Sequence, residues 1–287
     1  MLERMKRGSN PCQTFASEHA RLFQSGKKLP PGTSKPGRKI SGQAPRILIF
    51  SPHPDDECLV GGLALRLFRE AKWNVINVAV TLGSEGERRR ARKRELQNAC
   101  DVLGFGLIVA GFEKINLETR RKNRPQWKAS VQTIAGILAE HQPRVIFLPH
   151  EKDVHPAHIG THFLVLDALK TLLNKFNCFV VETEFWGQMA DPNLLVESST
   201  EEVGDLVAAL ACHVGEVKRN PYHARLPAGL MDNVRRGAES VGGRGGAAPD
   251  FVFGTIYRLQ KWRGGELCKI FNGGKFLNAK KNPGGLF

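Results

Sequence analysis

The stretch RILIFSPHPDDECLVGG, residues 46–62, decides the fold, because it joins an apolar run to a polar turn and then to a helix. Residues 46–51 form a short apolar run, which predicts a buried strand. Residues 53–57 hold one imidazole and three carboxylates. Residues 59–70 then carry apolar side chains at helical spacing. This order of elements is typical of an α/β protein.

The same alternation of strand and helix patterns continues downstream. Apolar or β-branched runs predict further strands over residues 74–81, 107–110, 144–149 and 178–184. Amphipathic patterns predict helices over residues 87–103, 127–140 and 158–174. Strands that alternate with helices predict an α/β fold, with a mostly parallel sheet and helices on both of its faces.

The chain is expected to have three segments. Residues 1–45 are predicted to be a basic N-terminal arm or linker, because a single amphipathic helix over residues 14–24 precedes the breaker-rich GKKLPPGTSKPGRKISGQAP. Residues 46–195 contain the strand and helix alternation and form the core. Residues 196–287 hold many glycines and aromatic residues, and are expected to form a smaller β-rich C-terminal section that completes one wall of the site.

Charge and cysteine content narrow the class of protein. The net charge of +14 is concentrated near the two ends of the chain, as is typical of solvated tails. The basic run over residues 88–94 contains no interleaved aromatic residue, which argues against binding of nucleic acid. Six scattered cysteines without a CxxC pair indicate reduced thiols. No apolar segment resembles a secretory signal or a membrane span, so a cytoplasmic protein is expected.

Two polar clusters follow predicted strands, namely SPHPDDE at residues 51–57 and HPAH at residues 155–158. Parallel strands present their ligands at their carboxyl ends, so both clusters should face the same edge of the sheet. Adjacent buried carboxylates are costly without a cation, and a catalytic zinc site needs three protein ligands. His53 and Asp56 can supply two ligands, and HPAH offers the third. Taken singly, the first cluster is also compatible with a helix cap and the second with an idle helix face.

The remaining groups then suggest amide hydrolysis. Asp55 lies next to a metal ligand and can accept a proton from a water molecule whose pKa a metal lowers. His155 can stabilise the oxyanion that develops on the amide carbonyl if its imidazole is protonated. Zinc suits these ligands, and so do ferrous iron and other divalent ions.

The same residues resemble the PIG-L/LmbE-like N-acetylglucosaminyl deacetylases over roughly residues 46–175. The matching motifs are HPDDE at 53–57, GG at 61–62, TLG at 81–83, RKREL at 92–96 and HPAH at 155–158. The resemblance implies a Rossmann-like fold and zinc-dependent removal of an acetyl group from an N-acetylglucosamine-type sugar. It implies the metal ligands His53, Asp56 and His158, with Asp55 as general base and His155 as the imidazole that polarises the carbonyl or protonates the amine.

Two positions depart from the usual family motifs. Ser51 stands where the family often has alanine, and Ala157 where it usually has aspartate. That aspartate is thought to orient or charge the catalytic histidine, and Asp153 is a candidate to replace it. Because of Ala157, a binding module that has lost catalysis is an alternative function for this fold. An amidase that acts on a non-sugar amide is a further alternative.

Four other side chains are candidates to contact the substrate, a small amino sugar that can carry a phosphate. Arg88 and Arg235 can bind a phosphate, although a run of basic residues on a helix is more often a face exposed to solvent. Trp186 can stack on a sugar ring, although core packing is its more common role. His213 lies on an apolar helical stretch and is a candidate to line the pocket or to belong to the core. The oligomeric state is not predicted.

Overall fold

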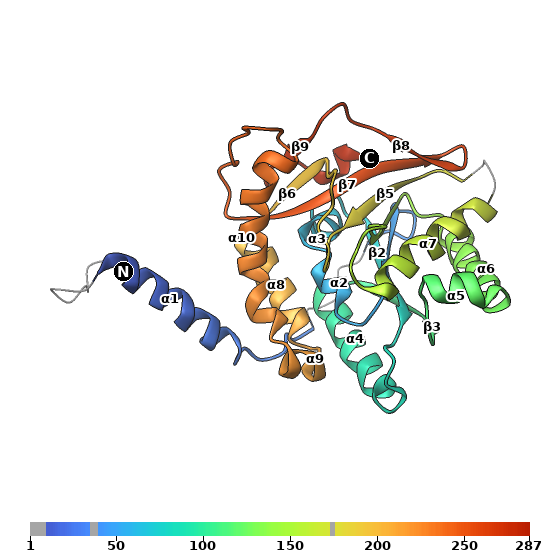
Figure 1. Ribbon diagram of the computed structural model, residues 1–287, viewed down its shortest axis with the longest axis horizontal. Helices are drawn as coiled ribbons and strands as arrows, with labels where there is room; N and C mark the ends of the chain where they lie inside the picture. The colour runs from blue at the N-terminus through green and yellow to red at the C-terminus, as the bar shows by residue number, and fades with distance from the viewer. Residues whose placement is uncertain (1–9, 35–39, 173–175) are drawn as a thin grey trace.

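The computed structural model describes residues 10–34, 40–172 and 176–287. Nine strands of this described part form one sheet (Figure 1). Their order is β3-β2-β1-β4-β5-β7-β6-β9, with β8 paired to β7. The strands are β1 (Arg46–Ser51), β2 (Asn74–Thr81), β3 (Gly106–Phe112), β4 (Val145–Pro149), β5 (Cys178–Thr183), β6 (Leu194–Ser198), β7 (Phe253–Arg263), β8 (Glu266–Lys269) and β9 (Lys275–Leu277). Strands β1 to β5 run parallel, so the predicted mostly parallel sheet is confirmed.

Helices cover both faces of the sheet, as predicted, because successive side chains of a strand point to opposite faces. Ile47 and Ile49 of β1 belong to one hydrophobic core, and Leu48 and Phe50 belong to the other. The first core is closed by α2 (Asp56–Leu59), α3 (Gly62–Arg69), α4 (Arg89–Leu103) and α8 (Thr200–Leu210). The second is closed by α6 (Arg124–His141) and α7 (Pro156–Thr171), with α5 (Leu117–Lys122) beside them.

The C-terminal residues extend the same sheet. Strand β7 pairs antiparallel with β5 and β6, so the expected extra strands become part of the main sheet. Helices α9 (Val214–Arg219) and α10 (Tyr222–Ser240), which the sequence analysis did not predict, come before these strands. Helix α10 packs against β7 and α8, and α9 lies near the end of α4 in Figure 1.

The predicted helix over residues 59–70 is interrupted in the structure. Helix α2 ends at Leu59 and α3 begins at Gly62. Gly61 has a φ of +79°, and a Cβ at this position would lie 2.2 Å from Thr255 Oγ1. The chain therefore breaks here because the turn passes directly against β7, a contact about 190 residues away that periodicity does not reveal.

The N-terminal arm is described in part. Its predicted helix over residues 14–24 is present as α1 (Pro11–Gly26), which contacts α10 and projects from the body of the molecule in Figure 1. Residues 1–9 and 35–39 of the arm lie outside the described residues, as do the last residues, 173 and 174, of the predicted helix over 158–174. Within the described ranges, no helix combines the length and apolar character that crossing a bilayer requires.

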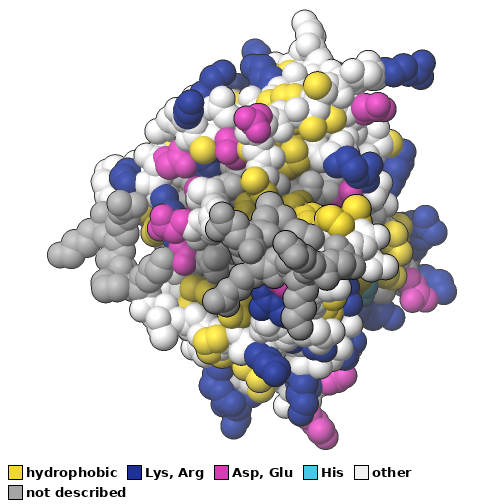
Figure 2. All heavy atoms as spheres, turned by 90° about the vertical axis from the view of Figure 1, so that its left-hand side faces the viewer, with side chains coloured by type: hydrophobic (Ala, Val, Ile, Leu, Met, Phe, Trp, Pro, Cys, Tyr) yellow, Lys and Arg dark blue, Asp and Glu magenta, His cyan; other side chains and the backbone are white. Residues whose placement is uncertain are grey.

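Basic side chains are spread over the surface. On the face shown in Figure 2, Lys and Arg side chains occupy several separate places, with Asp and Glu side chains among them. The described residues of this face therefore present separate basic groups instead of one continuous stripe of the kind that follows a nucleic-acid backbone.

Candidate active site

The site lies at the carboxyl ends of β1 and β4. These two strands are parallel neighbours, with Ile47 opposite Val145 and Ile49 opposite Phe147. The turn after β1 and the loop after β4 therefore meet at one edge of the sheet, as the strand pattern predicted. Thr81 at the end of β2 fixes the first turn, since its hydroxyl donates a hydrogen bond to the Pro52 carbonyl at 2.8 Å.

Three side chains form a compact triangle of donor atoms in this cleft. His53 Nδ1 lies 3.2 Å from His158 Nε2 and 3.5 Å from Asp56 Oδ2. His158 Nε2 lies 3.4 Å from Asp56 Oδ2. Tetrahedral zinc holds nitrogen and oxygen ligands at about 2.0–2.2 Å, which separates two ligands by about 3.4 Å. The donor set and its spacing therefore fit a single divalent ion.

Nearby groups orient this triangle. The backbone N–H of His53 donates a hydrogen bond to Asp56 Oδ2 at 2.8 Å. His158 is fully buried in the first turn of α7, and its Nδ1 faces Asp153 Oδ1 at 3.6 Å. Asp153 Oδ1 also accepts a hydrogen bond from the backbone N–H of His155 at 2.9 Å. A carboxylate on the second nitrogen of an imidazole fixes its orientation and tautomer, so Asp153 holds the ring of His158 with Nε2 toward the triangle.

Asp55 lines the same cleft, whose volume is about 410 Å³. Its φ of 112° places it in the left-handed region, and its backbone N–H donates a hydrogen bond to Glu57 Oε2 at 3.0 Å. Burial, followed by the charges of Asp56 and Glu57, raises the pKa of Asp55 well above its ordinary value. A divalent cation beside it would favour the ionised form, because an opposite charge within a few ångströms lowers a carboxyl pKa.

His155 is the N-cap of α7 and lies beside the triangle, with its ring centroid 4.8 Å from that of His53. Its Nδ1 accepts a hydrogen bond from the backbone N–H of Ala157 at 3.2 Å, so a neutral ring carries its proton on Nε2. Burial, then His53 and His158, lowers the pKa of His155. Asp153 binds the backbone of His155 and faces the ring of His158, so it orients the ring of His158 more directly than the ring of His155.

His213 lies behind the cleft. It is fully buried, and its Nε2 lies 2.6 Å from Glu57 Oε1. The other oxygen of Glu57 holds the backbone of Asp55. This placement suits a role in positioning Asp55 better than the substrate contact suggested from the sequence.

Three arginines converge on one carboxylate in the cleft wall. Arg88, Arg92 and Arg219 approach Glu216 at 3.4, 3.7 and 2.6 Å. Arg88 was a sequence candidate and Arg92 belongs to the same basic run, whereas Glu216 and Arg219 were missed. Glu216 and Arg219 lie on α9, which the sequence analysis did not predict.

The last two substrate candidates lie in different settings. Trp186 lines the cleft and its side chain is exposed, so it is available to a ligand. Arg235 on α10 is also exposed, but it pairs with Asp232 at 2.7 Å and is not one of the described residues that line the cleft. Its neighbour Arg236 instead pairs with Glu184 at the border of an adjoining cavity.

Known proteins are similar to the part of the chain that holds this site. Residues 48–169 match the family described as PIG-L, GlcNAc-PI de-N-acetylase. The probable N-acetyl-alpha-D-glucosaminyl L-malate deacetylase 2 of Bacillus cereus is 31% identical over 126 residues, which are 39% of this chain and 55% of that protein. The chain thus spans about half the length of this curated relative.

Solved structures share the fold at low identity. The N,N'-diacetylchitobiose deacetylase of Pyrococcus horikoshii superposes with a TM-score of 0.56 at 16% identity, over 91% of this chain and 96% of that chain. GalB, the 4-carboxy-2-hydroxymuconate hydratase of Pseudomonas putida KT2440, has a TM-score of 0.57 at 17% identity, over 75% and 95% of the chains. One fold therefore serves different reactions, and the activity has to be argued from the site. Residues 48–169 are thus similar to the PIG-L/LmbE-like deacetylases, in agreement with the resemblance of the sequence motifs.

Proposed function

We propose that this protein is a metal-dependent hydrolase that removes the acetyl group from an N-acetylglucosamine-type amino sugar. The observation that carries the proposal is the triangle of His53, Asp56 and His158, with Asp55 and His155 in the same cleft. The name of the Bacillus cereus relative, which describes a glucosaminyl deacetylase, supports the amino sugar as substrate class.

His53, Asp56 and His158 would hold the metal, which when bound lowers the pKa of a water molecule and polarises a carbonyl group. Asp55 accepts a proton from the water that attacks the amide carbon. His155 donates a hydrogen bond from Nε2 to the carbonyl oxygen as negative charge develops there. The C–N bond then breaks, the amine nitrogen takes up a proton, and acetate and the free amino sugar leave.

The three arginines around Glu216 are an argument for an anionic group on the substrate. Three guanidinium groups lie around the carboxylate of Glu216, so this side of the cleft offers several groups that can bind an anion. Arg88 and Arg219 are the more accessible of the three, with 34% and 69% of their side chains exposed. Guanidinium groups bind phosphate in a bidentate manner, so a sugar phosphate is the substrate that this wall would favour.

Release of acetate tests the proposal directly. Purified protein is incubated with N-acetylglucosamine, its 6-phosphate and diacetylchitobiose, with and without a chelator. We expect acetate release that falls to background with chelator and returns when zinc is restored, because the carbonyl group of the substrate is not polarised without the metal. A higher kcat/KM for the 6-phosphate would support the anionic contact. Metal-loaded protein that releases acetate from none of the three would contradict the proposed substrate class.

Glu57→Gln is expected to slow turnover while leaving the metal in place. The carboxylate joins the backbone N–H of Asp55 to His213, and an amide cannot accept hydrogen bonds from both with its two ends. A small displacement of Asp55 should reduce kcat by about tenfold to a hundredfold. The measurements are kcat and metal content per folded protein.

Cys58→Ala is the matched control for this change. It removes the thiol that donates a hydrogen bond to Glu57 Oε1 at 3.3 Å, and it leaves the hydrogen bonds of Glu57 with Asp55 and His213 intact. We expect some loss of thermal stability with nearly unchanged kcat. Equal kcat values for wild type and Glu57→Gln would show that Glu57 has no positioning role.

A further inference from the structure

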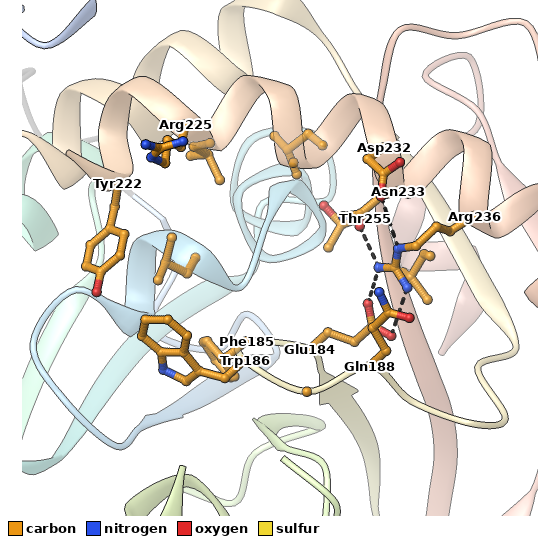
Figure 3. Close-up of a pocket in the computed structure, with 16 residues that line it drawn as sticks. Glu184, Phe185, Trp186, Gln188, Tyr222, Arg225, Asp232, Asn233, Arg236 and Thr255 are labelled. Atoms are coloured by element: carbon orange, nitrogen blue, oxygen red, sulfur yellow. Dashed lines mark hydrogen bonds and ion pairs between the residues drawn. The ribbon is translucent and has the colours of Figure 1, made fainter. Parts of the chain in front are cut away.

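A second cavity adjoins the cleft that holds the metal triangle. It has a volume of about 370 Å³ and lies between α10 and the segment 184–188 (Figure 3). Leu59, Trp186 and Tyr222 line both cavities, so the two are contiguous. The rings of Trp186 and Tyr222 meet edge to face at the junction, with centroids 6.0 Å apart. The second cavity therefore begins at the two rings that also border the cleft of the triangle.

The second cavity differs from the first in chemistry. Its walls are mainly apolar, with the side chains of Leu59, Phe185, Leu226, Leu230 and Ile256. Three of its four charged residues pair with one another, since Arg236 binds Glu184 and its Nε lies 3.6 Å from Asp232 Oδ2, as the dashed lines at one end of the cavity in Figure 3 indicate. The guanidinium group of the fourth, Arg225, lies over the ring of Phe23, 4.6 Å from its centroid. A cavity with apolar walls and neutralised charges favours an apolar ligand group.

The wall of this cavity is attached to the loop between β4 and α7, which contains Asp153. Asp153 Oδ2 accepts hydrogen bonds from the backbone N–H groups of Trp186 and Gly187, at 3.0 and 3.3 Å. Its other oxygen faces His158. The ring of Phe185 also packs edge to face on His158, with centroids 4.9 Å apart. The cavity is therefore held in a fixed position relative to the metal triangle.

We propose that this cavity binds an apolar or aromatic aglycone attached to the amino sugar. The inference rests on the proposed function, which places the acetyl group at the triangle. An acetyl group is too small to occupy a second cavity of this size, so the occupant is the part of the substrate on the other side of the sugar. Each CH₂ group that the cavity removes from water is expected to raise the affinity about fourfold.

Gly229→Leu tests this proposal by filling the cavity. Gly229 lines the cavity from α10, and a Cβ there would meet no atom within 4 Å. The change also replaces a helical glycine with a better helix former, so the fold should be retained. The test compares kcat/KM for N-acetylglucosamine with that for its n-hexyl and phenyl glycosides. In wild type we expect at least a tenfold advantage for the glycosides, and in Gly229→Leu we expect that advantage to disappear.

Gly204→Leu is the matched control. Gly204 lies on the exposed face of α8, has no atom within 4 Å of its Cβ position, and is not one of the described residues that line either cavity. We expect it to keep the glycoside advantage. Turnover of N-acetylglucosamine should stay within about twofold of wild type in Gly204→Leu.

Other outcomes separate the two proposals. Turnover of N-acetylglucosamine without a glycoside advantage, or an advantage that Gly229→Leu leaves intact, would overturn the aglycone cavity and leave the deacetylase function standing. A gain from longer N-acyl chains that Gly229→Leu removes would assign the cavity to the acyl group instead. Calorimetric binding of the deacetylated n-hexyl glycoside gives the same comparison without turnover. Its loss in Gly229→Leu alone would support the cavity even if no acetate were released.

Discussion

Replacing Asp55 with asparagine is expected to reduce kcat by about a thousandfold and to leave the bound metal in place, because a general base contributes about 10²- to 10⁴-fold to a rate. The amide has nearly the same shape as the carboxylate but cannot accept the proton. Asparagine also tolerates the left-handed backbone at φ 112°, which alanine would not. Kinetic constants and metal content per folded protein are measured on the same preparation.

Asp56→Asn is the natural comparison, because the two carboxylates are adjacent in the chain. Asp56 Oδ2 is part of the donor triangle, so this variant should bind the metal more weakly and regain activity when metal is in excess. Asp55→Asn should not respond to added metal. An Asp55→Asn enzyme with the wild-type rate would exclude Asp55 as the base, and one that lost its metal would make Asp55 a ligand.

Much of the fold was predictable because its signals are local. The strands over residues 46–51 and 74–81 were predicted with the bounds that β1 and β2 have, since each is a short apolar or β-branched run with polar flanks. Helix α5 was missed because it is a short polar segment, LETRRK, that the Asn116 side chain caps. Such a helix has no apolar periodicity to detect.

The centre of the site was also foreseeable, because two sequence motifs follow strands that turn out to be parallel neighbours. The surrounding layer was not. His213 reaches Glu57 across 156 residues of sequence, and only the packing of α8 against α2 brings them together. No spacing rule within the sequence carries that information.

Arg235 shows that a prediction of substrate contacts on a helix fails when it is wrong by a single residue. Successive residues on an α-helix are about 100° apart around its axis. Arg235 therefore points into solvent with 74% of its side chain exposed, while Arg236 turns inward and is 16% exposed. The sequence analysis named Arg235, but which of the two neighbouring arginines turns inward depends on where α10 packs.

His158→Ala is expected to abolish activity through loss of the metal. The change removes one corner of the triangle and leaves His53 and Asp56 as two ligands, too few for a catalytic site. Metal affinity should fall by more than about 100-fold. Removal of a group that only orients a ligand lowers the affinity by up to about 100-fold, and removal of a ligand itself should cost more. In wild type, added zinc should raise the Tm, because a ligand that binds the folded state stabilises it. In His158→Ala, that rise should be absent at the same zinc concentration.

His162→Ala controls for the loss of a buried imidazole from the same helix. His162 is one turn further along α7 and is also buried, and its Nδ1 donates a hydrogen bond to the Pro149 carbonyl, 2.9 Å away and outside the triangle. Both variants should lose thermal stability from the cavity they create. Only His158→Ala should lose the metal, so metal content and the zinc-dependent rise in Tm separate a ligand from a structural histidine. A stoichiometric metal in purified His158→Ala would mean that the ion is held elsewhere, and the assignment of the triangle would have to be abandoned.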